Sequence, residues 1–261
     1  MSQNILEINN LSKYFGGLAA VSECSLKVKK GTITGIIGPN GSGKTTLFNL
    51  IAGNLKSSAG SVIFNNENIT DVPSYELFSK GLLRTFQIAH EFTNLSVLEN
   101  LMMVPGNQSG EKLVNALLKP SLVAKEESLI KEKAMEVINF LNLSHLKNEL
   151  AGNLSGGQKK LLELGRTMMV DAKLVLLDEV GAGVNRTLLK DLGTAIEKLN
   201  KEKGYTFCMI EHDMDFIGRL CDPVIVMAEG SVLFEGSVED AKKDEKVIES
   251  YLGRGSKLKD N

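Results

Sequence analysis

Residues 38–45 read GPNGSGKT, and this spacing of glycines, lysine and threonine leaves little freedom in how the neighbouring chain folds. The octapeptide follows the apolar run 33–37 and precedes a helical pattern at 46–51, the context in which the G-x-x-x-x-G-K-[ST] pattern binds phosphate. Glycines let successive backbone N–H groups point at one anion, and the following helix adds its positive end. We expect Lys44 to reach the terminal phosphates of a nucleotide and the Thr45 hydroxyl to face Mg²⁺. The predicted phosphate-binding set is Gly38, Pro39, Asn40, Gly41, Ser42, Gly43, Lys44, Thr45 and Thr46.

The hydrophobic pattern predicts an α/β fold with two kinds of strand. Residues 33–37, 174–177 and 205–210 are nearly continuous apolar runs, which is typical of parallel strands covered on both faces. Residues 5–8, 25–28 and 61–64 are shorter and partly alternating, which favours a small antiparallel sheet near the N-terminus.

The middle of the chain, from about 87 to 165, is predicted to be mostly helical. One apolar stripe recurs at helical spacing and is predicted to be core: Ile130, Ala134, Val137, Ile138 and Leu141. Residues 111–119 are bracketed by Gly and Pro and predict a small helix of their own. We therefore expect one domain over 1–252, with a core of 1–86 and 166–252 and a helical subdomain of about 87–165. The polar segment 253–261 is expected to be a frayed tail.

The amino-acid composition disfavours some classes of partner and favours a reducing cellular compartment. The 261 residues carry 30 Lys and Arg against 32 Asp and Glu, so the net charge of −2 disfavours a nucleic-acid partner. Three cysteines, Cys24, Cys208 and Cys221, form no C-x-x-C pair, which argues against a disulfide framework or a zinc site and favours reduced, cytosolic thiols. The first ten residues do not form a signal peptide. The apolar run 224–228 is far shorter than the ~18 residues of a membrane helix, so any membrane role requires a partner.

A second glycine-rich turn, LSGGQ, occupies residues 154–158. Ser155 is placed as the N-cap of a following helix that carries several leucines and methionines. Capping alone explains the serine, but the full string together with residues 38–45 points to one family.

With both motifs, the chain resembles the ATP-binding cassettes of ABC transporters over nearly its whole length. It is similar in particular to the G-type ATP-binding subunits of branched-chain amino acid importers. The stretches that carry this resemblance are KYFGGLAAV (13–21), IIGPNGSGKTTLFNLIAG (36–53), GLLRTFQ (81–87), VLENL (97–101), LSGGQ (154–158), IEHDMDFI (210–217) and VIESYLG (247–253). The fold implied is a P-loop NTPase core of mostly parallel sheet, with an N-terminal antiparallel β subdomain and a helical subdomain inserted before the signature LSGGQ.

Two acids follow the apolar run 174–177. Asp178 is expected at the carboxyl end of a buried strand, where α/β sheets bind ligands, and its carboxylate suits Mg²⁺. Glu179 is the candidate general base for the attacking water.

The family resemblance supplies the remaining roles. Gln87 matches the glutamine that reaches Mg²⁺ and the water, His212 matches the histidine that contacts the γ-phosphate, and Phe15 matches the aromatic residue that stacks on adenine. His90 and His145 match no catalytic position. The signature residues that would contact nucleotide are Ser155, Gly156, Gly157 and Gln158.

One departure from the family pattern follows the catalytic acids. Val180 stands where the family usually has proline, and Gly181 replaces a more typical small residue. Residues 182–185 then fall where the family has its dimer-contact loop. The departure bears on the stiffness of this loop and on the coupling between paired sites.

One phosphate loop and one signature turn imply a two-fold pair, because each of two ATP molecules can then lie between the loop of one copy and the signature of the other. The pair is either a homodimer or a heterodimer with a related cassette. The resemblance implies ATP hydrolysis coupled to transport, membrane permease subunits as partners, an indirect link to a solute-binding protein, and a peripheral place on the cytoplasmic side of the membrane.

Two other readings stay open from the sequence. A soluble ABC ATPase without a membrane partner, such as an iron-sulfur assembly factor, would share both motifs. A P-loop kinase or GTPase shares residues 38–45 but does not explain LSGGQ. The transported solute is not encoded in these motifs.

Overall fold

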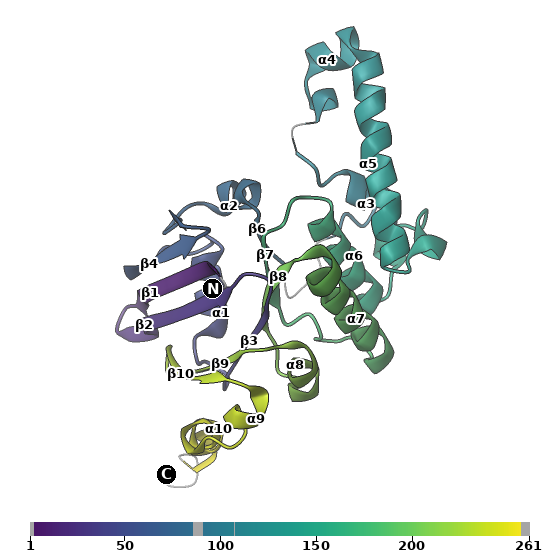
Figure 1. Cartoon of the computed structure of the whole chain (residues 1–261). Coiled ribbons are helices and arrows are strands. Elements are labelled where there is room, and N and C mark those ends of the chain that lie inside the picture. Colours follow the sequence, from purple (N-terminus) through teal and green to yellow (C-terminus); the bar gives the residue numbers. More distant parts are fainter. Residues whose placement is uncertain (1–2, 86–90, 107, 257–261) are drawn as a thin grey trace. The chain divides into compact units, whose positions relative to one another are not determined.

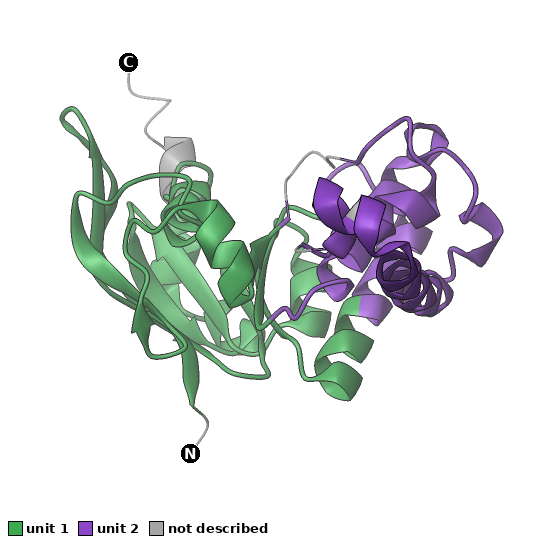
Figure 2. Ribbon diagram, turned by 90° about the horizontal axis from the view of Figure 1, so that it is seen from above, with its two compact units in different colours: residues 1–84, 173–181, 196–261 green, residues 85–172, 182–195 purple. Residues whose placement is uncertain are grey.

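The computed structural model describes residues 3–85, 91–106 and 108–256. Its residues divide into two compact units, coloured separately in Figure 2. The first unit comprises Met1–Arg84, Lys173–Gly181 and Ile196–Asn261, and the second comprises Thr85–Ala172 and Ala182–Ala195.

The first unit contains the expected antiparallel sheet (Figure 1). Its strands, in the order β2-β1-β4-β5, are β1 (Asn4–Phe15), β2 (Leu18–Lys29), β4 (Ala59–Phe64) and β5 (Glu67–Asn68). β1 and β2 are each twelve residues long, well beyond the short segments expected from the sequence. Register shifts interrupt their pairing, for example between Ile8 and Leu11, so strict alternation holds only over short stretches.

The second sheet of this unit positions the chemistry. Its strands, in the order β10-β9-β3-β8-β7-β6, are β3 (Ile33–Ile37), β6 (Leu82–Arg84), β7 (Leu174–Asp178), β8 (Thr206–Ile210), β9 (Val224–Ala228) and β10 (Ser231–Gly236). All neighbours pair in parallel except β9 and β10. Every residue of β3, β7 and β8 is buried, which explains their unbroken apolar character. Asp178 pairs with Ile210, and Ile210 with Ile36, so these three strands end at one edge.

The helices of the first unit are α1 (Lys44–Ile51), α2 (Ser74–Lys80), α8 (Met214–Leu220), α9 (Val238–Ala241) and α10 (Glu245–Ser256). Of these helices, α1 and α2 share one hydrophobic core with the two sheets. α1 contacts both β2 and β7, and it buries Leu47 and Phe48 completely. α10 runs to Ser256, four residues past the point at which we expected the ordered chain to end.

The second unit is mainly helical. It contains α3 (Val97–Met102), α4 (Leu113–Leu118), α5 (Pro120–Phe140), α6 (Gly156–Met168) and the 3₁₀ turns Ser109–Glu111, Ser144–Leu146 and Ala151–Asn153. The predicted stripe on α5 buries Ala134, Val137 and Ile138, with Ile130 partly exposed. Gly165 lets α6 approach this stripe, since a Cβ there would lie 2.8 Å from Leu141 Cδ1. Because α6 packs on α3 and α5, the unit extends to Ala172 rather than to 165.

α7 (Arg186–Lys203) contributes its first part to the second unit and its remainder to the first, so 182–195 also differ from the expected boundaries. α4 corresponds to the small helix predicted at 111–119, and four of its apolar side chains are exposed: Leu113, Val114, Leu117 and Leu118. Among the residues described, no helix is both long enough and apolar enough to cross a membrane.

Candidate functional site

The loop between β3 and α1 requires glycine where the backbone passes other chain segments. Gly38 and Gly43 have positive φ of 148° and 100°. A Cβ at Gly38 would collide with the carbonyl oxygen of Met227, and one at Gly43 with that of Ala20. The loop is therefore packed between the ends of distant strands, in a shape that other residues could not adopt without strain.

The turn between β9 and β10 ties this loop to the antiparallel sheet. The Gly230 N–H donates to the Ser42 carbonyl at 3.0 Å, and the Ser22 N–H donates to the Gly230 carbonyl at 2.9 Å. These backbone bonds fix the loop before any side chain acts.

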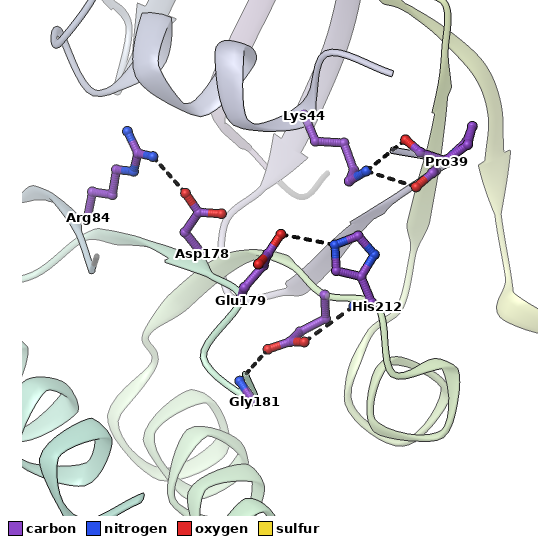
Figure 3. Close-up of polar contacts among 9 residues, drawn as sticks. Pro39, Lys44, Arg84, Asp178, Glu179, Gly181 and His212 are labelled. Carbon is purple, nitrogen blue, oxygen red and sulfur yellow. Dashed lines mark hydrogen bonds and ion pairs between the residues drawn. The ribbon is translucent and has the colours of Figure 1, made fainter. Parts of the chain in front are cut away.

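Lys44 begins α1, and its ammonium lies against the loop (Figure 3). Its Nζ donates to the carbonyl oxygens of Gly38 at 2.8 Å and Pro39 at 3.1 Å, and the residue is 5% exposed. The positive charge is thus held against two carbonyl oxygens of the loop and at the lining of the pocket described next, where an anionic phosphate would meet it.

A pocket of about 150 Å³ opens beside the loop. Its described lining consists of Asn40, Gly41, Gly43, Lys44, Thr45, Thr46, Glu179 and His212. This volume suits the phosphate end of a nucleotide rather than a whole one, since pockets for complete ligands are usually larger than about 300 Å³. The predicted phosphate loop, base and histidine therefore meet at one site within the first unit.

Glu179 and His212 contact each other at this pocket (Figure 3). His212 Nε2 lies 2.9 Å from Glu179 Oε1. Because an ionised carboxylate only accepts hydrogen bonds, the proton of this contact belongs to His212 Nε2 when Glu179 is charged. Glu179 has φ of +49°, a left-handed conformation that costs energy in a residue with a Cβ and that clusters at functional sites.

Asp178, the last residue of β7, is 3% exposed and forms a buried ion pair. Its Oδ2 accepts from Arg84 Nη2 at 2.6 Å, and Arg84 Nη1 donates to Asn49 Oδ1 at 2.6 Å. The other carboxylate oxygen, Oδ1, is buried without a hydrogen-bond partner among the described residues. An oriented carboxylate with one unsatisfied oxygen fits a hard cation such as Mg²⁺.

The signature turn lies in the second unit and caps α6. The Ser155 hydroxyl accepts from the Gln158 N–H at 3.4 Å, while Gln158 Oε1 accepts from the Ser155 N–H at 2.9 Å. A Cβ at Gly157 would lie 2.5 Å from Leu188 Cδ1, and one at Gly156 would lie 3.8 Å from the Gly183 carbonyl oxygen. The signature therefore packs against residues 182–188, and Ser155 and Gly156 remain exposed.

The other predicted residues are placed as follows. Phe15 ends β1 and is half exposed, with Lys13 Nζ 5.3 Å from the centre of its ring, and it does not belong to the pocket lining. His145 is exposed. Gln87 and His90 lie outside the described residues.

Two residues of the site were not identified from the sequence as site residues. Arg84, which occurs in the GLLRTFQ stretch, pairs with Asp178 across 94 positions of the chain. Glu211 lies between the last residue of β8 and His212, and it is buried. Its position directly before His212 was the signal available, because a glutamate that follows a buried strand is itself expected at the ligand-binding edge of the sheet.

Comparisons with known proteins agree with this geometry. A family model described as ABC transporter matches residues 21–182. A probable branched-chain amino acid transport ATP-binding protein, LivG of Archaeoglobus fulgidus, is 44% identical over 95% of this chain and 95% of that protein. A protein of the same description from Methanocaldococcus jannaschii is 43% identical over 97% and 98%.

Solved structures give the same result for the fold. The ADP conformation of an ATP-binding cassette of an ABC transporter matches with a TM-score of 0.82 and 40% identity, covering 97% of this chain and 100% of that one. The predicted fold class and the resemblance are thereby confirmed. The chain belongs to the ABC transporter family, of which it is an ATP-binding cassette.

Proposed function

We propose that the chain hydrolyses ATP to energise a membrane importer of branched-chain amino acids or of a related small polar solute. The observation that carries the proposal is the pocket in which the phosphate loop, Glu179 and His212 meet. The names of the relatives from Archaeoglobus and Methanocaldococcus support the class of solute.

Each residue of the site has a separate role in hydrolysis, which its position indicates. Lys44, held in the loop by the carbonyls of Gly38 and Pro39, neutralises the β- and γ-phosphates. Glu179 accepts a proton from the attacking water, and His212 holds the Glu179 carboxylate and contacts the γ-phosphate. Phe15 stacks on adenine. Each of these roles is a proposal for this chain.

Asp178, Thr45 and Gln87 would hold Mg²⁺. The unsatisfied Asp178 Oδ1 supports this assignment, and Arg84 holds the carboxylate through its hydrogen bond to Oδ2. When bound, Mg²⁺ supplies electrostatic neutralisation of the nucleotide phosphates.

The working form is proposed to be a pair of cassettes. The pocket's described lining comes from the first unit alone, whereas Ser155 and Gly156 expose their helix N-terminus in the second. A second cassette, either a copy of this chain or a related one, could present its signature to the nucleotide. The pair would dock on permease subunits at the cytoplasmic side of the membrane, and a solute-binding protein would act through the permease.

Affinity capture tests the transporter assignment. The chain, tagged at its N-terminus, is purified from detergent-solubilised membranes of its own cells, with Lys44→Ala as a catalytically impaired control. We expect hydrophobic permease subunits in the eluate, and ATPase activity that rises with a solute-binding protein loaded with leucine. Recovery of soluble scaffold proteins in their place would overturn the transporter assignment and favour an assembly factor.

A further inference from the structure

Glu211 is a buried acid at the functional edge of the sheet. It follows Ile210, the last residue of β8, and precedes His212, and it is 5% exposed. An acid this deeply buried is costly unless backbone or side-chain donors satisfy it. Its partners therefore indicate what it does.

Both oxygens of the Glu211 carboxylate accept backbone hydrogen bonds. The Gly181 N–H donates to Oε1 at 2.6 Å, and the His212 N–H donates to Oε2 at 3.3 Å. Gly181 lies two residues after Glu179. One carboxylate thus ties together the two loops whose side chains, Glu179 and His212, meet in the pocket.

The same loops have a second tie and a strained residue. The Glu179 N–H donates to the Ile210 carbonyl at 2.9 Å, next to Glu211. Glu179 adopts its left-handed conformation just where the chain leaves β7. Such a conformation persists only when surrounding contacts determine it, and the Gly181 contact lies directly downstream.

The residues that follow Glu179 restrict its backbone little, which makes the contact between Gly181 and Glu211 more important. Val180 and Gly181 provide no ring to restrict the backbone after Glu179, whereas a proline would fix one φ angle. The Glu211 carboxylate supplies a restraint at this point from another strand.

The titratable groups near Glu211 lie just after β7, β8 and α8. Burial raises the pKa of Glu211 and the charge of Glu179 raises it further, whereas the Gly181 and His212 amides and the His212 ring lower it, with a net rise. Burial, and to a lesser extent the nearby Cys208 and Glu211, raises the pKa of the thiol of Cys221, the residue after α8. The two amide donors are the contacts that favour an ionised Glu211 and keep it in place.

We propose that Glu211 is a positioning residue that holds the loop after Glu179 against the His212 loop, so that the base and the histidine stay aligned for hydrolysis. The inference rests on the proposed roles of Glu179 and His212. It assigns Glu211 no contact with ATP.

The test compares Glu211→Ala and Glu211→Gln with wild type and with Glu235→Gln, a control that removes an exposed acid from β10. Alanine loses both amide contacts, and kcat is expected to fall about 10²-fold, the usual effect of a small misplacement of reacting groups. Glutamine keeps one acceptor for Gly181, so its kcat should fall only about ten-fold. KM and Kd for ATP should stay within about two-fold in both variants, because the phosphate loop is untouched. Glu235→Gln should behave as wild type.

Equal activity of Glu211→Ala and wild type would overturn the positioning role. A loss of ATP affinity and melting temperature that accounts for the whole loss of activity would also overturn it, since Glu211 would then be only a structural residue. Glu179→Gln, assayed in parallel, separates this inference from the proposed function. If Glu179→Gln keeps near-normal turnover, the base assignment fails and the inference fails with it. If Glu179→Gln is inactive and Glu211→Ala is normal, only the inference fails.

Discussion

Asp178 and Glu179 are neighbours in the chain, yet their surroundings suit their carboxylates to different roles. Asp178 is the last residue of β7, where the extended backbone directs it into a buried pair with Arg84. Glu179 turns into a left-handed conformation and reaches the pocket and His212. One change of backbone conformation therefore separates a carboxylate suited to a cation from one suited to a proton.

Lys44→Ala should remove ATP affinity and turnover together. The ammonium is buried against the Gly38 and Pro39 carbonyls and would face the phosphates in the bound state as well as during reaction. Loss of one charge-assisted contact should weaken binding at least ten-fold. Calorimetric titration with ATP measures this, and unchanged affinity would contradict the role given to Lys44.

At the scale of elements, burial decides which helices carry stability. The α5 stripe was predictable, because its spacing shows directly in the sequence and its members meet α3 and α6. α4 was predictable as a helix, but its exposure was not, since periodicity identifies an apolar face without showing whether anything covers it. The lengths of β1 and β2 were missed because their register shifts break the alternation.

Two substitutions separate these cases. Ile138→Ala on α5 removes a fully buried side chain and should cost about 2–5 kcal/mol of unfolding free energy. Leu117→Ser on α4 changes a side chain that is 70% exposed and should stay within about 0.5 kcal/mol of wild type. Urea unfolding followed by circular dichroism measures both. A larger loss in Leu117→Ser would mean that α4 packs more tightly than its exposure indicates.

The candidate docking region for a permease covers residues 87–100, of which the structure describes 91–100, and its last four residues belong to α3. Phe92 is half exposed beside the Arg166 guanidinium, and Leu95 is partly buried, which leaves Phe92 as the better apolar contact. Asn100 organises the segment, because its side chain accepts from the Phe92 N–H and donates to the Phe92 carbonyl. Glu91 is committed to an ion pair with Lys159 at 2.7 Å, so a probe belongs at exposed Asn94.

Asn94→Cys should therefore crosslink to a permease subunit in membranes that contain the assembled transporter. Background should be low, since the native thiols are buried and burial raises the pKa of Cys24 to about 11 and of Cys208 to about 12. Asn66→Cys, exposed in the turn between β4 and β5, is the matched control. Equal crosslinking of both variants, or labelling of lipid alone by Asn94→Cys, would place docking elsewhere.

At the scale of the whole molecule, the sequence was sufficient to predict the order of strands and loops along the chain. It was not sufficient to predict contacts between residues that lie far apart in the sequence. Continuous apolar runs predicted β3, β7 and β8, and the ends of these strands then brought Lys44, Glu179 and His212 to one pocket. The Arg84 to Asp178 pair and the Gly181 to Glu211 bond join distant positions that no periodicity relates. Such contacts depend on which strands are neighbours in the sheet, and local sequence patterns do not encode this order.

Glu179→Gln should keep ATP binding, nearly stop hydrolysis and trap a closed pair of chains. Glutamine preserves the shape of the side chain but cannot accept the proton of water, so ~10² to 10⁴ in rate is lost. That corresponds to about 3 to 5 kcal/mol of barrier. Because ATP would be bound by both partners, its persistence prolongs the pair.

Light scattering of this variant with magnesium and ATP, then with magnesium and ADP, tests the expectation. An ATP-dependent doubling of mass supports the paired mechanism. A variant that stays single with ATP, even after addition of a related cassette from the same cells, would contradict it.

The packing of the phosphate loop also sets when a growing chain acquires its activity. The loop is shaped by the carbonyls of Ala20 and Met227 and is bonded through Gly230, so its two sides come from opposite ends of the sequence. A ribosome-bound chain that has passed the loop but not yet released residues 224–230 lacks one side of the packing that shapes the loop. Retention on immobilised ATP should therefore begin only after most of the protein has been synthesised, which would keep unfinished cassettes from competing for nucleotide.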